Sequence, residues 1–308
     1  MEDPLAELIT AYFELNGSTV DELRLPDGAE PGPLQFMRYV ARNTPFVARG
    51  AAAAWPAVRT WSVPFLRAAL ADHTVNVAVT PNGLADAPTP HAGGLVFAKP
   101  WEEDQAFPAF LDHVVQSPPG AVRYAQTQND NLRHEYAALA AGVPPDVSFA
   151  RVALQRPPEA INLWIGNARS VTALHRDTYE NVYVQVRGRK HVVLLPPLCQ
   201  PCVGERPLAP YHYERRPRRR AAGCCAETTG DEECNLVLVP DHPGDDRDDD
   251  RDDDRDAVPF ATWDPDRPDA NATPYSHLAR PLRVTLDPGD MLYLPAMCPS
   301  RTTVSVLL

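Results

Sequence analysis

Two residues of metal-binding type, His175 and Asp177, stand two positions apart in the sequence. In a β-strand, side chains two residues apart point to the same face. An imidazole and a carboxylate that converge in this way make two of the three ligands in the facial triad that holds non-haem Fe(II). Since a His-x-Asp triplet occurs by chance in many proteins, the residues around it decide its meaning.

A hydroxyl and a cation lie close to this pair in the sequence. Thr172 is three residues before His175, and Lys190 is fifteen residues after it. A metal site that uses a keto-acid cosubstrate needs such groups, because lysine pairs with the distal carboxylate and threonine donates a hydrogen bond to it. Taken alone, Lys190 is better explained as an exposed hairpin lysine, so the hypothesis depends on the whole group.

The elements that would position these residues are short. Apolar spacing predicts helices and a few strands before residue 128, and then a series of short strands separated by turns. This pattern is typical of an α+β protein with a sandwich, jelly roll or barrel. We expect helices at 4–15, 33–42 and 64–71 and, within 102–117, around 107–115, and strands at 45–49, 75–80, 122–127, 162–165, 172–175, 181–187, 191–195, 282–286 and 291–294.

The domain boundaries follow from the same pattern. Residues 1–120 are expected to form a helical N-terminal region with flanking strands, and residues 121–308 a barrel. Residues 199–281 have no regular periodicity and read as an insertion, largely disordered around 213–258. Within it, the run 215–220 (RRPRRR) is either a nuclear-localisation or nucleic-acid patch or a solvated loop, and the loop is favoured.

Charge and cysteine content exclude several classes of protein. The net charge is −12, but residues 245–256 (DDRDDDRDDDRD) supply half of it, so the overall charge does not favour nucleic-acid binding. No apolar run approaches the ~18 residues of a membrane span, and the first residues lack a signal peptide's basic region. We therefore expect a cytoplasmic or nuclear protein with free thiols. Zinc binding is a weaker alternative, because the spacing of the cysteines is irregular; they are Cys199, Cys202, Cys224, Cys225, Cys234 and Cys298.

Longer motifs are more specific than the triplet. They are WPAVRTWSVPFLRA (55–68), VNVAVTPNGLADA (75–87), INLWIGNARSVTALHRDTYENVYVQVRGRKHVVLLPP (161–197) and GDMLYLPA (289–296). With these motifs, the chain resembles the JmjC-domain, cupin-like oxygenases that depend on Fe(II), 2-oxoglutarate and O2. The resemblance covers about residues 33–296 apart from the insertion, and it implies a double-stranded β-helix with the metal at one mouth.

The resemblance also implies a role for each site residue. His175 and Asp177 match the first two iron ligands. The other matches concern 2-oxoglutarate and the substrate: Thr172, Lys190 and often Tyr124 hold the distal carboxylate, Asn181 lines the cosubstrate pocket, and Tyr179 and Glu180 are expected at the substrate entrance.

The resemblance is strongest to lysyl hydroxylases that act at lysine C3 of developmentally regulated GTP-binding proteins. It therefore implies a protein substrate and a possible homodimer, and a lysine substrate favours acidic residues near the mouth. The alternatives are a histone lysine demethylase and a non-catalytic cupin-like binding module.

One departure from the family pattern limits these expectations. The family places a histidine, the third iron ligand, shortly after the motif 294–296 (LPA), whereas this sequence has Ser300 there. The family's last barrel strand and a C-terminal helical region are also not recognisable. Three interpretations stay open, namely a frameshift or missed splice in the gene model, a truncated pseudo-enzyme, and a metal site with two protein ligands. For the chain as written, we expect weak or no hydroxylase activity.

Overall fold

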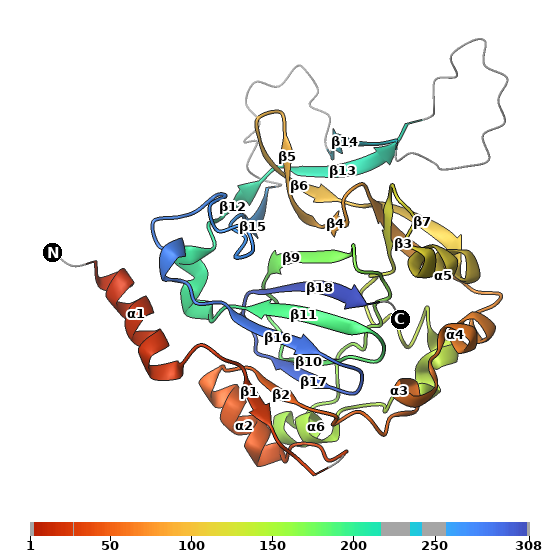
Figure 1. Ribbon diagram of the computed structural model, residues 1–308, viewed down its shortest axis with the longest axis horizontal. Coiled ribbons are helices and arrows are strands. Elements are labelled where there is room, and N and C mark those ends of the chain that lie inside the picture. The colour runs from red at the N-terminus through yellow and green to blue at the C-terminus, as the bar shows by residue number, and fades with distance from the viewer. Residues whose placement is uncertain (1–2, 27, 217–234, 242–256, 307–308) are drawn as a thin grey trace.

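Two facing β-sheets form the centre of the molecule, with helices around one side (Figure 1). The computed structural model describes residues 3–26, 28–216, 235–241 and 257–306. The larger sheet has the order β16 (Leu282–Leu286), β11 (Arg189–Leu194), β18 (Ser300–Val306), β9 (Val171–His175) and β4 (Leu84–Ala85). The smaller sheet has the order β1 (Asp21–Leu23), β2 (Phe46–Ala48), β17 (Met291–Leu294) and β10 (Asn181–Val184).

The inner faces of the two sheets share one apolar core. Val192 and Leu194 of β11 pack in the same cluster as Val284 of β16 and Leu292 of β17. Alternation along β11 places Lys190 on this inner face and His191 on the outer one. The α+β class and the double-stranded β-helix expected from the sequence are confirmed.

The expectation that the last barrel strand is missing is wrong, because the last described strand, β18, lies between β11 and β9 in the larger sheet. Among the described strands, β10 has one neighbour, β17, so the smaller sheet is open on its other side. The sequence did not predict β18, which pairs antiparallel with both β11 and β9. Its residues, SRTTVSV, include β-branched types that favour a strand.

Helices close the outside of this barrel. The helix α1 (Pro4–Asn16) begins at Asp3, whose carboxylate accepts a hydrogen bond from the backbone N–H of Leu5. Its buried residues Ile9 and Phe13 pack with Leu174, on the outer face of β9. Two further helices, α2 (Pro33–Arg42) and α6 (Ser148–Leu154), cover the smaller sheet. No described helix is long and apolar enough to cross a membrane.

A second apolar cluster lies beside the barrel. It is formed by the sheet β7 (Trp101–Ala106), β3 (Thr74–Thr80) and β8 (Val122–Tyr124), with the helices α3 (Pro56–Thr60), α4 (Val63–Ala69), α5 (Phe107–Gln116) and η1 (Ala137–Gly142). The helix expected within 102–117, around 107–115, is confirmed by α5, and the residues before it form β7, which pairs with β3. The strand expected at 162–165 is reduced to one bridge between Ala125 and Ile165.

The segment 199–281 contains more structure than the sequence indicated. Its strands are β12 (Glu205–Leu208), β13 (Pro210–Arg215), β14 (Leu236–Pro240) and β15 (Val258–Ala261), and its short helices are η2 (Pro197–Cys202) and η3 (Ser276–Leu278). The strand β12 pairs with β15, and β13 joins a sheet with β14, β6 (Gly94–Lys99) and β5 (Ala87–His91). The expected disorder around 213–258 is wrong where the chain forms the end of β13 and the strand β14. The rest of that expectation, 217–234 and 242–256, lies outside the described residues, as do most of the arginine run, the acidic run and Cys224, Cys225 and Cys234.

Candidate active site

An irregularity in β9 brings Thr172 and His175 to the same face. Side chains three residues apart in a regular strand point to opposite faces. Here Thr172 pairs with Thr302 and His175 with Ser300, so β9 has one more residue than β18 over this stretch. Such a bulge shifts the alternation by one residue. Both side chains therefore face the barrel interior.

His175 is oriented for binding a metal. Its Nδ1 lies 2.9 Å from the carbonyl oxygen of Ala173, so Nδ1–H donates to that carbonyl and Nε2 keeps its lone pair. The Nε2 atom is 3.8 Å from Oδ2 of Asp177, within reach of one shared ion. The structure therefore brings this predicted pair together, with the tautomer that a metal ligand needs.

Lys190 is a buried cation without an anionic partner. It is only 5% exposed, and among the described residues no carboxylate forms an ion pair with it. Its Nζ atom lies 4.8 Å from the ring centre of Tyr183 and 5.8 Å from that of Trp164. The two rings stack at 6.2 Å. Burial lowers the pKa of Lys190 to about 8. Aromatic faces offset part of the cost of burying this charge, and an incoming carboxylate would offset much more.

Tyr124 and Thr172 place hydroxyl groups beside each other in the same interior. Burial raises the pKa of Tyr124 to about 12, and the Thr172 side chain opposes that rise. The Tyr124 ring is packed closely against Gly166, where an added Cβ would lie 2.7 Å from a ring carbon. Gly166 is therefore needed for Tyr124 to occupy this position. Hydroxyl groups and an ammonium group such as that of Lys190 are donors of the kind that bind a carboxylate.

The residues predicted to line the entrance have different roles. Tyr179 is 58% exposed, as an entrance residue would be. Glu180 accepts hydrogen bonds from the hydroxyl of Tyr293 at 2.6 Å and from the backbone N–H of Ala296 at 3.1 Å. It therefore joins the start of β10 to the end of β17. The amide of Asn181 donates to the carbonyl of Tyr179 at 3.3 Å, and no described contact places it against Lys190.

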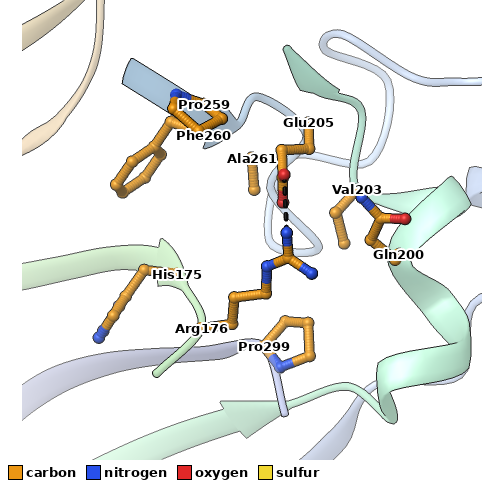
Figure 2. Close-up of a pocket in the computed structure, with 9 residues that line it drawn as sticks. All are labelled: His175, Arg176, Gln200, Val203, Glu205, Pro259, Phe260, Ala261 and Pro299. Carbon is orange, nitrogen blue, oxygen red and sulfur yellow. Dashed lines mark hydrogen bonds and ion pairs between the residues drawn. The ribbon is translucent and has the colours of Figure 1, made fainter. Parts of the chain in front are cut away.

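A cavity of about 190 Å³ lies on the other side of His175 (Figure 2). Glu205 and Phe260 line it from the segment 199–281, and Arg176 lines it from the barrel. Arg176 and Glu205 form an ion pair at 2.8 Å, and the His175 imidazole points away from that pair (Figure 2). The sequence did not predict this wall, because no local signal connects Glu205 to a strand ending some thirty residues earlier.

Asp86 is an acidic residue near the mouth that the motifs did not single out. It accepts a hydrogen bond from the Gln126 amide at 2.9 Å. The surrounding protein removes part of its water and raises its pKa, although the residue stays open to solvent. Gln126 and the nearby His175 oppose that rise. The expected acidic group near the mouth is therefore present.

The third metal ligand is not supplied. Ser300 pairs directly with His175, at the position where the sequence pattern placed the missing histidine. Within the described residues, no group of three His, Cys, Asp or Glu side chains could hold a metal ion. Cys199, Cys202 and Cys298 are buried free thiols and belong to no such group of described residues, which gives no support for zinc there. The described site therefore offers a metal ion two donors, His175 and Asp177.

Comparison with known proteins agrees with this geometry. The model of the cupin-like domain family matches residues 33–298. "Lysine-specific demethylase JMJ32" of Arabidopsis thaliana is 42% identical over 61% of this chain and 55% of its own length. "Bifunctional peptidase and (3S)-lysyl hydroxylase JMJD7" of Homo sapiens is 35% identical over 87% of this chain and 76% of its own.

A third relative, "JmjC domain-containing protein E" of Dictyostelium discoideum, is 31% identical over 87% of this chain and 75% of its own length. The chain therefore belongs to the cupin-like JmjC family of 2-oxoglutarate-dependent dioxygenases, which includes hydroxylases and demethylases.

Proposed function

We propose that this chain is a protein hydroxylase that uses Fe(II), 2-oxoglutarate and O2 to oxidise a lysine side chain, with low activity. The observation that carries the proposal is Lys190, a buried cation without an anionic partner among the described residues, on the same inner face as His175. A buried charge of this kind is costly unless a ligand neutralises it. A dicarboxylate that binds Lys190 at one end would place its other end toward His175 and Asp177.

Each residue has a definite task in this proposal. Lys190 and the hydroxyls of Thr172 and Tyr124 bind the distal carboxylate of 2-oxoglutarate and fix its orientation. His175 and Asp177 would hold the metal, which when bound supplies the family's oxidising chemistry. The stacked rings of Trp164 and Tyr183 cover Lys190 and keep water from it.

The proposed substrate is a lysine of another protein. The human relative's name describes a (3S)-lysyl hydroxylase, and Asp86 offers a carboxylate near the mouth for an ammonium group. Hydroxylation at C3 of a lysine in a developmentally regulated GTP-binding protein is the specific form of this proposal. Demethylation of a methylated lysine is the second candidate, because the Arabidopsis relative is named a lysine-specific demethylase.

Calorimetric titration with 2-oxoglutarate tests the binding step. Replacing Lys190 by methionine should weaken 2-oxoglutarate binding by about 10- to 100-fold, since a hydrogen-bonded charge pair is lost. The matched control is His191→Met, on the outer face of the same strand, which should bind like the unchanged chain. Equal affinity of Lys190→Met and the unchanged chain would refute the proposal.

Mass spectrometry of a lysine peptide incubated with Fe(II), 2-oxoglutarate and O2 then distinguishes the reactions. Slow gain of one oxygen atom on an unmodified lysine is expected, and loss of a methyl group from a methylated lysine would favour the demethylase. No product with either peptide would favour a non-catalytic module.

A further inference from the structure

The register of β18 determines what stands at the third metal position. Ser300 is the first residue of β18 and lies directly opposite His175 of β9 and Leu194 of β11. Residues directly opposite each other in an antiparallel pair have side chains on the same face. Ser300 therefore shares the interior face with His175.

The segment before Ser300 is tied to the metal-binding segment by its backbone. The N–H of Met297 donates to the carbonyl of Asp177 at 2.7 Å, and the N–H of Leu195 donates to the carbonyl of Pro299 at 2.9 Å. These bonds hold residues 297–300 between β11 and the end of β9. The third position is thus built by the backbone, and only the side chain at this position departs from a three-ligand site.

Among the described residues, no other thiol, carboxylate or imidazole takes over this role. The Cys298 thiol donates to the carbonyl oxygen of Leu195 at 2.9 Å, in the apolar cluster between the sheets. Burial raises its pKa to about 12, so the thiolate that a metal requires is disfavoured. Asp86 also lies outside any three-residue group in the described part of the chain.

The Ser300 side chain itself is a weak metal donor. It is 9% exposed, and its hydroxyl forms no hydrogen bond with another described residue. A neutral hydroxyl binds divalent iron or manganese less strongly than imidazole does. Serine lacks the imidazole ring that a histidine would offer at this position, so a donor from solution is needed to give a metal at His175 and Asp177 a third strong ligand.

We infer that the metal centre is a two-residue site, His175 and Asp177, and that the third position at Ser300 accepts a small exogenous donor such as imidazole. The inference rests on the proposed function, because it concerns the same site. On this inference, the proposed low activity results from weak binding of the metal ion. Recognition of 2-oxoglutarate by Lys190 is unaffected.

Metal titration of the full chain with Mn(II) tests this inference, with free Mn(II) measured by electron paramagnetic resonance. Ser300→His should bind Mn(II) at least about 100-fold more tightly than the unchanged chain, because a direct ligand contributes more than a group that only orients one. The control Thr303→His adds the same ring to the same strand, β18, but on its outer face, opposite His191. It should leave the affinity for Mn(II) unchanged.

Added imidazole provides a second, independent readout. It should tighten Mn(II) binding by the unchanged chain and have little effect on Ser300→His, whose position is already filled. His175→Ala should lose both effects, which separates binding at this site from imidazole chemistry in solution. Circular dichroism of each variant establishes that it is folded.

Several outcomes would overturn the inference. They are tight Mn(II) binding by the unchanged chain without imidazole, equal affinities for folded Ser300→His and Thr303→His, or an imidazole effect that survives His175→Ala. None of them depends on a protein substrate. If Ser300→His gains Mn(II) affinity but Lys190→Met binds 2-oxoglutarate normally, the proposed function fails and the metal inference stands. The opposite pair of results would reject the metal inference alone.

Discussion

Lys190 is a cation that the fold holds away from water before any anion arrives. Its pKa of about 8 lies well below the ordinary value of 10.5 because burial removes the water that stabilises its charge. The buried charge of Lys190 is therefore unfavourable in the ligand-free protein, and a bound carboxylate would offset this cost. Single residues in this site are therefore best tested by the binding of ligands, because their contribution appears only when the partner is present.

The pH dependence of 2-oxoglutarate binding follows from this pKa. Binding requires protonated Lys190, and the ligand-free site loses its proton as the pH rises through about 8. The dissociation constant for 2-oxoglutarate should therefore be flat below pH 8 and should rise by about tenfold per pH unit above it. Calorimetry from about pH 6.5 to about pH 9.5, which spans the pKa of Lys190, would show this. A curve without a bend near pH 8, or the same bend in Lys190→Met, would contradict it.

Among the strands, the site depends on side-chain hydrogen bonds that connect one strand end to another. Glu180, which the sequence suggested for the entrance, fastens β10 to β17 through the Tyr293 hydroxyl and the Ala296 N–H. This tie matters because β10 has a described neighbour on one side only. Strand edges of this kind are prone to local opening and to pairing with other chains.

Removing the Tyr293 hydroxyl should weaken this fastening. Tyr293 is fully buried, so Tyr293→Phe leaves one Glu180 hydrogen bond unmade and should cost about 1–3 kcal/mol of unfolding free energy. The control Tyr179→Phe changes a 58% exposed residue nearby and should alter stability by less than about 0.5 kcal/mol. Urea denaturation measures both, and equal midpoints would show that Glu180 has no fastening role.

A local pattern in the sequence was sufficient for one pair of site residues. His175 and Asp177 are two residues apart, and their side chains converge as the alternation of a strand predicts. Thr172 shares the face of His175 only because of the bulge in β9, which its spacing did not predict. The role of Glu180 and the wall contributed by Glu205 depend on partners more than twenty residues away. No periodicity encodes such contacts, because the register between distant strands is set by packing of the whole sheet.

At the scale of the whole molecule, the N-terminal helix is part of the barrel's outer cover. Phe13 of α1 is 2% exposed and packs with Leu174, Cys199 and Cys202 behind the metal-binding strand. The hydrogen bond with Cys202, together with burial, raises the pKa of Cys199. The same hydrogen bond lowers the pKa of Cys202. Both thiols are fully buried, so they should be inert as long as α1 stays in place and keeps reagents away from them.

Phe13→Ala should both destabilise the protein and expose these thiols. Loss of a fully buried phenylalanine costs about 3–5 kcal/mol, and alkylation of Cys199 and Cys202 by iodoacetamide should become faster. Leu15→Ala is the matched control, since Leu15 belongs to the same helix but is 86% exposed. Peptide mapping after timed alkylation measures the rates, and equal rates in both variants would show that α1 does not protect the thiols.

The extra residue in β9 determines what a one-residue deletion in this strand would change. In-frame loss of the Ala173 codon would turn the bulge into a regular strand, in which the threonine and the histidine are two apart and still share a face. The sheet could therefore keep its pairing with β18. What disappears is the carbonyl that accepts the imidazole Nδ1–H. A protein with this deletion would still fold, but its histidine would no longer be held in the tautomer that binds a metal.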